Sequence, residues 1–522
     1  MSKKKIIIIG AGPAGLAAGY ELVNHKDFEV FIIEKLNIPG GIARTEIYKG
    51  NRMDLGGHRF FTKSDNIFKI WTDILPIQGK PSKDDIITGR YKSMKYSASG
   101  PDPEKEDNVM LIRKRISRIY FMKNFFDYPV SLNYNTIKNL GLSKIAKISL
   151  SYLNSRITPI KNEKSLEDFF INRFGKELYK LFFKDYTEKV WGMRCDKIKP
   201  EWGAQRIKGL SISSIIKDIL LNAISKKYKH TKKVETTLIR QFYYPKFGPG
   251  QMWNEMAKKI ELPGGKIIKN TTVSNIEIKG NKIVSLTAIN NVTGEKTIFE
   301  TDYVISSMPI KDLINSINKP DETVKNIANE LLYRDFIAVG LLVKEVKIKN
   351  ETAEKTINNI LPDNWIYLQD KGVIAGRLQI FNNWSPYLVK DLNNIWLGVE
   401  YFCFEKDKLW NLNNYELINL AIKDLSKIGI IGKNDFIDGY VVKAEKAYPA
   451  YFGGYERFDG IKEYLNSIEN LYPVGRNGMH KYNNMDHSMI TAIESAKNII
   501  ENRKDKNRIW NINIEKEYQE EK

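Results

Sequence analysis

The sequence predicts an α/β fold, and three observations predict it. A β-branched run at Lys4–Ile9 ends in a glycine, a helical apolar pattern covers Ala14–Val23, and a second β-rich run follows at Glu29–Glu34. Strand patterns return far downstream, at 266–273, at 303–306 and again at 471–475 ahead of a helical segment. Strands that return after long interruptions predict a discontinuous first domain, built from residues 1–90, 235–310 and 455–505.

Two further regions interrupt this domain. The pattern from Ser64 to Lys233 is mostly helical, and a polar stretch at 92–108 has the composition of a mobile loop. Ser165–Asp168 resembles a capping box that opens a helix with aromatic residues at core spacing. Short β-rich runs then occur at 336–346, 364–368, 377–381 and 396–402. The expected further units are a mainly helical domain at 91–234, an antiparallel sheet at 311–454 and a charged, frayed tail at 506–522.

The composition is that of a globular chain and excludes several kinds of protein. With 522 residues and 42% hydrophobic content, the chain can bury a large core. No run approaches the roughly 20 apolar residues of a membrane span. Cys195 and Cys403 are the only cysteines, so we expect no disulfide framework and no metal site. This cysteine usage fits a cytoplasmic protein.

The formal net charge of +20 does not by itself identify a partner. The 82 basic residues are spread along the chain and are not gathered in one arm, so we expect no nucleic-acid partner. An anionic small molecule or an acidic membrane surface would equally be attracted by such a field. A general bias towards Lys, Ile and Asn explains the charge as well.

A glycine motif lies between the first strand and the first helix. In Gly10-Ala-Gly12-Pro-Ala14-Gly15 the glycines permit a tight turn and let a pyrophosphate approach backbone amides at the helix N-terminus. Glu34, at the end of the next strand, is placed to hold the adenosine ribose hydroxyls. The motif and its context predict a dinucleotide-binding fold.

Two later segments indicate FAD and not NAD. Gly40-Gly41-Ile-Ala-Arg44-Thr45 resembles the second signature of FAD proteins, and Val474-Gly475-Arg476 precedes a helix near the C-terminus. With these pieces the sequence resembles the FAD superfamily that includes amine oxidases, protoporphyrinogen oxidase, phytoene desaturases and UDP-galactopyranose mutase. The resemblance implies an FAD-binding Rossmann-type domain with a helical insertion and an antiparallel β-sheet substrate domain.

Segments in the middle of the chain resemble UDP-galactopyranose mutases in particular. Tyr186-Thr-Glu-Lys-Val-Trp191 is similar to a segment that helps to hold the uridine in the bacterial enzymes, and Gly56-Gly57-His58 to a loop that places a histidine beside the flavin. Arg206 and Arg377 occupy the places of two arginines that contact the diphosphate. Tyr448 and Tyr482 stand where the family has tyrosines that touch the same group, and Asp486-His487-Ser488 completes the match. These matches are collinear over most of the chain.

The resemblance therefore implies three sets of site residues. The catalytic set is His58, Arg206 and Arg377. The substrate-binding set is Tyr128, Tyr186, Trp191, Trp384, Tyr448 and Tyr482. The cofactor-binding set is Gly10, Gly12, Ala14, Gly15, Glu34, Gly41, Arg44, Gly57, His58, Val273, Gly475, Arg476, Asp486, His487 and Ser488.

The sequence departs from the family at places that concern the substrate. Trp384 stands where the family stretch has a tyrosine, so a phenolic hydroxyl is replaced by an indole donor. Ser131 replaces a glutamine, and Met485 replaces a polar residue before Asp486. The nucleotide sugar is therefore left open by the sequence.

The resemblance implies ring contraction of a nucleoside-diphosphate sugar by reduced FAD. N5 of the reduced flavin attacks the anomeric carbon and displaces the diphosphate, so that the sugar ring can open and reclose. A reduced nicotinamide or another electron donor would reduce the flavin, and two arginines would hold the diphosphate. Two alternatives stay open: an FAD-dependent oxidoreductase of the amine oxidase or protoporphyrinogen oxidase type, and a flavin-bearing binding protein without turnover.

Overall fold

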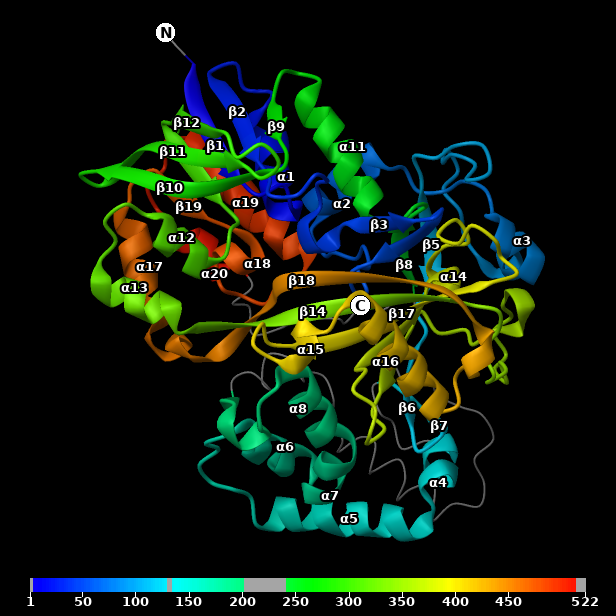
Figure 1. Cartoon of the computed structure of the whole chain (residues 1–522). Helices are drawn as coiled ribbons and strands as arrows, with labels where there is room; N and C mark the ends of the chain where they lie inside the picture. Colours follow the sequence, from blue (N-terminus) through cyan, green and yellow to red (C-terminus); the bar gives the residue numbers. More distant parts are fainter. Residues whose placement is uncertain (1–2, 129–133, 201–240, 513–522) are drawn as a thin grey trace.

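A parallel sheet near the N-terminus forms the first layer of the protein. The computed structural model describes residues 3–128, 134–200 and 241–512, and Figure 1 places this sheet at one end of the molecule. Its order is β19-β13-β1-β2-β9, and every neighbouring pair is parallel. The strands are β1 (Lys4–Ile9), β2 (Phe28–Ile33), β9 (Lys266–Ile268), β13 (Tyr303–Ser306) and β19 (Leu471–Pro473). The prediction of a strand system assembled from distant segments is confirmed.

Both faces of this sheet are covered, as the unbroken apolar run in β1 requires. Successive strand residues point to opposite faces. Ile32 lies against Gly19 of helix α1 (Pro13–Leu22), whereas the ring of Phe31 lies 6.1 Å from that of Phe299. Phe299 belongs to an antiparallel sheet of β10 (Thr271–Lys279), β11 (Lys282–Asn290) and β12 (Lys296–Glu300). Helices α11 (Pro249–Glu261) and α19 (Met485–Ile500) flank α1.

A seven-stranded sheet forms the middle layer in Figure 1. Its order is β18-β14-β17-β16-β15-β6-β7, antiparallel except for the parallel pair β15 and β6. The strands are β6 (Ser117–Phe121), β7 (Asn124–Asp127), β14 (Leu331–Val343), β15 (Trp365–Leu368), β16 (Arg377–Ile380), β17 (Ile395–Cys403) and β18 (Phe436–Gly453). Pairs β3 (Thr45–Tyr48) with β4 (Asn51–Asp54), and β5 (Met110–Lys114) with β8 (Gln241–Pro245), complete the strands.

The described part of the segment from Ser64 to Lys233 is mostly helical, as predicted, but the sequence did not predict its strands at 110–127. The turn between β6 and β7 consists of Met122 and Lys123, both at positive φ (53° and 59°). Hairpin turns of this kind normally use Asn-Gly or Asp-Gly. Because neither residue is a turn former, the hairpin carried no recognisable signal.

A group of helices lies beyond the seven-stranded sheet at the far end of the molecule (Figure 1). It consists of α4 (Tyr134–Leu140), α5 (Leu142–Ile157), α6 (Leu166–Phe174), α7 (Lys176–Leu178) and α8 (Asp185–Trp191), with a π-helical turn at Tyr179–Lys184. The predicted capping box is confirmed: Ser165 Oγ accepts from the Asp168 amide, and an Asp168 carboxylate oxygen accepts from the Ser165 amide, both at 3.1 Å. Phe169, Phe170 and Phe174 are buried, as predicted.

The remaining helices cover the edges of the two main sheets. They are α2 (Asp65–Ile74), α3 (Lys83–Thr88), α12 (Ile310–Ser316), α13 (Glu322–Asn329), α14 (Phe381–Trp384), α15 (Lys408–Asn411), α16 (Asn414–Lys427), α17 (Phe458–Ser467), α18 (Gly475–Gly478) and α20 (Asn507–Asn511). Within the described ranges, no helix combines the length and apolar character needed to cross a bilayer. In the same ranges, no group of three or more His, Cys, Asp and Glu side chains is arranged to hold a metal ion.

The segment 92–108 is anchored, which corrects the prediction of a mobile loop. The Ser97 amide donates to Gln78 O at 3.1 Å, and the Gly79 amide donates to Pro101 O at 2.8 Å. Glu104 accepts from the Lys83 amide at 2.8 Å. These bonds fix the segment to the loop at Gln78 and Gly79 and to the first residue of α3.

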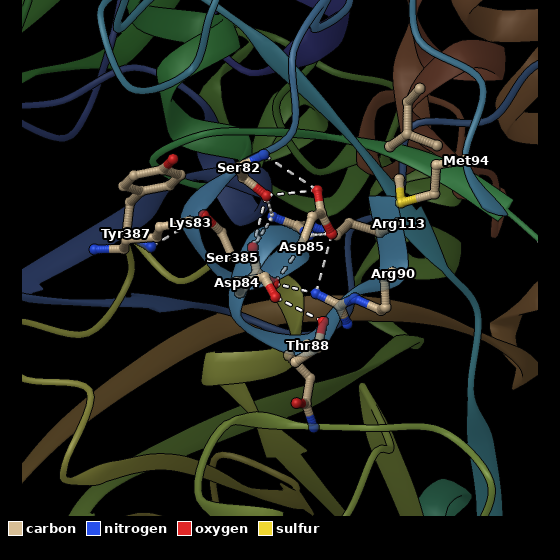
Figure 2. A network of polar contacts seen from close by, with 12 residues as sticks. Ser82, Lys83, Asp84, Asp85, Thr88, Arg90, Met94, Arg113, Ser385 and Tyr387 are labelled. Carbon is tan, nitrogen blue, oxygen red and sulfur yellow. Dashed lines mark hydrogen bonds and ion pairs between the residues drawn. The ribbon is translucent and has the colours of Figure 1, made fainter. Parts of the chain in front are cut away.

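A buried polar network lies beside this segment (Figure 2). Arg113 contacts Asp84 at 3.1 Å and Asp85 at 3.4 Å, and Arg90 pairs with the same two carboxylates. Ser82 Oγ donates to both carboxylates, at 2.6 and 2.7 Å. Burial would raise the pKa of Asp84, but the two arginines outweigh it and hold that pKa below its usual range. The Asp84 carboxylate is therefore charged and paired.

The start of the predicted tail is also packed. Ile509 and Trp510 of α20 are buried, and Trp510 Nε1 donates to Asn466 at 2.9 Å. Residues 506–512 are therefore packed against the protein and not frayed, which corrects the prediction for this part of the tail. The rest of the predicted tail, 513–522, lies outside the described residues.

Candidate active site

The first two glycine segments meet at the C-terminal end of β1. Gly10 has φ of 95°, and a Cβ there would lie 2.3 Å from Ser307 Oγ. A Cβ on Gly15 would lie 1.8 Å from Gly10 O. These two glycines are therefore required by the turn itself. A Cβ on Gly12 would meet only Gly41, at 3.9 Å, so Gly12 borders open space between the two segments.

Glu34 ties this turn to the second strand. One carboxylate oxygen accepts from the Ala11 amide at 2.6 Å, and the other accepts from the Leu36 amide at 2.9 Å. Burial raises the pKa of Glu34, although these amide bonds oppose the shift. The Thr271 amide donates to the backbone oxygen of Glu34 at 2.8 Å. Strand β10 therefore begins beside Glu34, and the buried Val273 is its third residue.

Arg44 shapes the second glycine segment from within. Its Nε lies 2.6 Å from a Glu46 oxygen, and its Nη1 donates to Gly41 O at 2.9 Å. The side chain is buried. Arg44 therefore holds the loop that carries Gly41, next to Gly12.

The C-terminal segment joins the same place. Gly475 has φ of 74°, a Cβ there would lie 2.9 Å from Ala14 Cβ, and its amide donates to Thr491 Oγ1 at 2.9 Å. The first turn of α19 carries Asp486, His487 and Ser488. His487 Nδ1 lies 3.3 Å from an Asp486 oxygen, and Ser488 Oγ donates to Asn483 at 2.8 Å. The structure thus brings the first, second and last predicted cofactor segments together.

His58 lies on a loop that packs against two tryptophans. Its Nε2 is 3.0 Å from Leu55 O, which can only accept, so this nitrogen carries the proton. Burial, followed by the charge of Arg476, lowers the pKa of His58 to about 4, and the ring is neutral at physiological pH. A Cβ on Gly57 would lie 2.3 Å from the Trp365 ring and 3.2 Å from that of Trp384.

Arg476 links the cofactor segments to the predicted substrate tyrosines. Its Nε and Nη2 donate to Asn483 O at 3.1 and 2.8 Å. The guanidinium lies 4.6 Å from the centre of the Tyr482 ring and 5.6 Å from that of Tyr448. Those two rings stack at 5.7 Å with an angle of 14°.

Arg377 is a second arginine close to Tyr448. Its Nε donates to Tyr186 Oη at 2.9 Å, and its Nη1 lies 3.4 Å from Glu400. Burial opposes the charge, but Tyr186 and Glu400 outweigh it and keep the pKa of Arg377 well above its usual value. Burial raises the pKa of Tyr448 to about 12, although both Arg377 and Arg476 lower it. Tyr448 therefore lies close to two arginines.

Helix α8 is fixed on the seven-stranded sheet, which positions Tyr186. Arg334 Nε donates to Val190 O at 3.0 Å and its Nη2 donates to Phe402 O at 2.8 Å. Lys189 Nζ donates to Leu368 O and Ala375 O at 3.0 and 3.1 Å, and burial lowers its pKa to about 8. Both cations bind carbonyl groups and join the helix to the strands.

Three residues around Arg377 were missed by the sequence analysis. Tyr367 stacks on Tyr128 at 4.3 Å and its ring lies 5.8 Å from the Arg377 guanidinium. Gln379 donates to Glu400 at 2.8 Å, and both side chains are buried. A carboxylate within the apolar run of β17 was the signal that could have identified Glu400, because a buried charge requires a partner.

Trp384 is not a substrate-facing residue in this structure, which corrects its prediction. It is fully buried, and Nε1 donates to Asn364 O at 2.8 Å. Its ring packs against Phe242, Tyr244 and Trp365 at 5.2–6.0 Å. The Trp384 indole, whose single donor is satisfied inside the core, packs against Gly57 of the His58 loop.

The other predicted residues have different outcomes. Trp191 is buried at the end of α8, and Arg206 and Ser131 lie outside the described residues.

Comparisons with known proteins agree with the fold. Residues 8–74 match the family model described as an NAD(P)-binding Rossmann-like domain. A crystal structure of reduced UDP-galactopyranose mutase is 20% identical, with a TM-score of 0.76 over 98% of this chain and 99% of that one. The chain has the fold of UDP-galactopyranose mutase.

Two structures of proteins named as oxidases share the fold less closely. A putative protoporphyrinogen oxidase from Exiguobacterium sp. 255-15 is 14% identical, with a TM-score of 0.65 over 97% of this chain and 99% of that one. Putrescine oxidase is 12% identical, with a TM-score of 0.57 over 96% of this chain and 99% of that one. The amine-oxidase-like architecture predicted from the sequence is confirmed. The reaction has to be argued from the residues.

Proposed function

We propose that the protein is an FAD-dependent nucleotide-sugar mutase that interconverts pyranose and furanose forms. One observation carries the proposal: Arg377 and Arg476 both lie close to the buried Tyr448, and Arg476 directly follows Gly475, which lies against Ala14 of the glycine turn. Two arginines surrounded by aromatic rings suit an anionic ligand that also carries a flat base, because the arginines can bind the anionic group and the rings can stack on the base. An oxidase of small amines has no anionic substrate group for such a pair to bind.

The residues at the end of β1 fit FAD. Gly12 and Gly41 face one another across open space, and the N-terminus of α1 points to the same place, which suits a pyrophosphate. Glu34 lies at the end of β2, where a ribose would be bound. Gly475 and the first turn of α19 complete the cradle from the C-terminal side.

When bound and reduced, FAD supplies a nucleophilic nitrogen for the anomeric carbon of the sugar. In our proposal, Arg377 holds the diphosphate through paired charge-assisted hydrogen bonds, both before and after it leaves. Tyr186 and Glu400 orient the guanidinium for this task. Arg206 is the proposed second arginine, as the sequence resemblance implies.

The remaining side chains bind the substrate and exclude water from the site. Tyr448 and Tyr482 offer hydroxyls to the diphosphate, and Tyr128 with Tyr367 offers a stacked surface for the base. His58 is neutral and donates to Leu55 O, so it positions the loop beside the flavin and does not act as a general base. The proposed roles need no net transfer of electrons to the sugar.

A panel of UDP- and dTDP-sugars tests the proposal directly. The purified protein is incubated with each sugar, oxidised or after reduction by dithionite or a reduced nicotinamide, and the products are separated by chromatography. We expect a furanose product only when the protein has been reduced, and none with the oxidised protein. The reductant should not be consumed during turnover. Stoichiometric hydrogen peroxide or quinol formation with an organic donor would overturn the mutase and favour the oxidoreductase.

A further inference from the structure

Helix α5 carries an apolar stripe that the described part of the chain leaves exposed. Leu142, Leu150, Leu153 and Ile157 are 79%, 67%, 49% and 78% exposed. At 3.6 residues per turn these four side chains lie within an arc of about 80°. Single exposed leucines are ordinary on protein surfaces, but four on one helix face form a contiguous patch.

The stripe is distinct from the face by which α5 packs. Ile148, Tyr152 and Ser155 are buried and face α6 and α7. These residues lie on the other side of the helix from Leu150 and Ile157. The helix therefore has two apolar faces, one of which serves the core. In Figure 1 α5 forms the outer rim of the helical region, at the end of the molecule away from the parallel sheet.

The charged residues on α5 and next to it in the sequence are all of one sign. Between residues 128 and 162 the sequence contains five basic residues and no acidic one. Lys138, Lys147, Arg156 and Lys161 are exposed. In projection, Lys147 and Arg156 flank the apolar stripe on its two sides. Apolar side chains bordered by lysine and arginine are typical of helices that lie in a membrane interface.

We propose that α5 docks the protein on an anionic lipid surface. The leucines and Ile157 would enter the boundary between headgroups and acyl chains, while the flanking bases remain among the anionic headgroups. A second copy of the chain fits less well, because a twofold contact would set this basic patch against itself. A nucleic acid would use the bases but has no place for the apolar stripe. The docking does not depend on the proposed reaction.

Vesicle binding tests this surface with the full chain. Vesicles of phosphatidylcholine mixed with phosphatidylserine are compared with pure phosphatidylcholine by co-sedimentation. We expect binding to the anionic vesicles, weakened by salt, and little binding to the neutral ones. The double variant Leu150→Glu with Ile157→Glu should bind at least roughly tenfold more weakly, and Lys147→Glu roughly fivefold more weakly.

A matched control separates the stripe from general surface hydrophobicity. Leu262 and Val292 are 83% and 77% exposed and lie on other elements. Leu262→Glu with Val292→Glu should bind anionic vesicles as the unchanged protein does. Equal binding to both vesicle types, or undiminished binding of the α5 variant, would overturn the proposal. Failure to bind vesicles together with a self-association that Leu150→Glu abolishes in sedimentation would assign the stripe to a second copy instead.

Discussion

Arg377 Nε donates a hydrogen bond to Tyr186 Oη at 2.9 Å, and the two residues are 191 positions apart in the chain. Arg377 lies on β16 of the seven-stranded sheet, whereas Tyr186 lies on α8 of the helical region. The bond therefore joins the two regions that the sequence assigned to the substrate. Glu400 holds the same guanidinium from the sheet side.

We expect Arg377→Ala to weaken nucleoside-diphosphate binding while FAD stays bound. Removing one partner of a desolvated, hydrogen-bonded charge pair typically costs about 2–5 kcal/mol. Calorimetric titration with UDP measures the loss, and flavin absorbance measures the cofactor. Arg206→Ala should likewise weaken UDP binding while FAD stays bound, if Arg206 is the second arginine that holds the diphosphate. Arg508→Ala, whose side chain is 65% exposed on α20, is the control; unchanged UDP affinity in the Arg377 variant would contradict the mutase proposal.

We expect Tyr186→Phe to weaken UDP binding less than Arg377→Ala does. The change keeps the ring but removes the oxygen that accepts from Arg377, and a single hydrogen bond of this kind contributes about 1–2 kcal/mol. The same titration provides the measurement. In the Arg377→Ala background, Tyr186→Phe should have almost no further effect, because the two residues act through one contact. Additive losses would show that Tyr186 acts independently of the arginine.

The sequence was sufficient to predict the glycine turn at the end of β1 and the position of Glu34 beside it. Gly10, Gly15 and Glu34 are determined by local turn geometry and strand ends, which a sequence displays directly. Tyr367 and Gln379 were not predicted, because their importance comes from a strand register that sets them beside Arg377 and Glu400. Register depends on long-range pairing, which short patterns do not encode.

Trp384 illustrates the opposite error. A position in a family motif suggested a substrate contact, but the indole fills a space between Phe242, Tyr244 and Trp365. Whether a side chain points to the core or to the site depends on the backbone around it, which the motif does not specify. The hairpin at Met122 and Lys123 was missed for a related reason, since tertiary pairing imposes positive φ on residues that do not favour it.

We expect Gly12→Val to abolish FAD binding without unfolding the protein. The added side chain would occupy the open space towards Gly41, where the pyrophosphate is proposed to lie. Flavin absorbance and circular dichroism give the two readouts. Gly460→Val is the matched control, because its nearest contact for a Cβ is similar, Ile327 at 3.8 Å. A folded Gly12 variant with its full complement of FAD would remove the basis of the cofactor assignment.

We expect Arg113→Met to lower the free energy of unfolding by about 3–5 kcal/mol, because it leaves the buried Asp84 and Asp85 with Arg90 alone. Urea unfolding followed by fluorescence provides the measurement. The neighbouring Lys114→Met removes a half-exposed pair with Glu354 and should cost no more than about 1 kcal/mol. Adding Asp84→Asn to Arg113→Met should recover part of the loss; no recovery would mean that packing, and not charge, accounts for the effect.

We expect His480 to make the protein less stable in acid. The ring is fully buried, Nε2 is 3.0 Å from Ala450 O, and Tyr333 and Tyr455 pack against it. Burial lowers its pKa to about 4, whereas the unfolded chain has a histidine pKa of about 6.5. The unfolded state therefore binds a proton first as the pH falls. The contribution of the neutral, buried His480 to the free energy of unfolding is fully present above pH 6.5. It decreases as the pH falls below 6.5, and the decrease levels off near pH 4.

The gap between these two pKa values corresponds to about 3 kcal/mol of unfolding free energy. His480→Phe removes this titration and loses the bond to Ala450 at every pH alike. Urea unfolding of both proteins across this range should give curves that converge towards acid, with the unchanged protein losing about 3 kcal/mol more than the variant. Because Asp54 and His58 titrate in both proteins, their effects cancel in the difference. Parallel curves would mean that His480 is protonated in the folded protein and that its burial does not control the acid response.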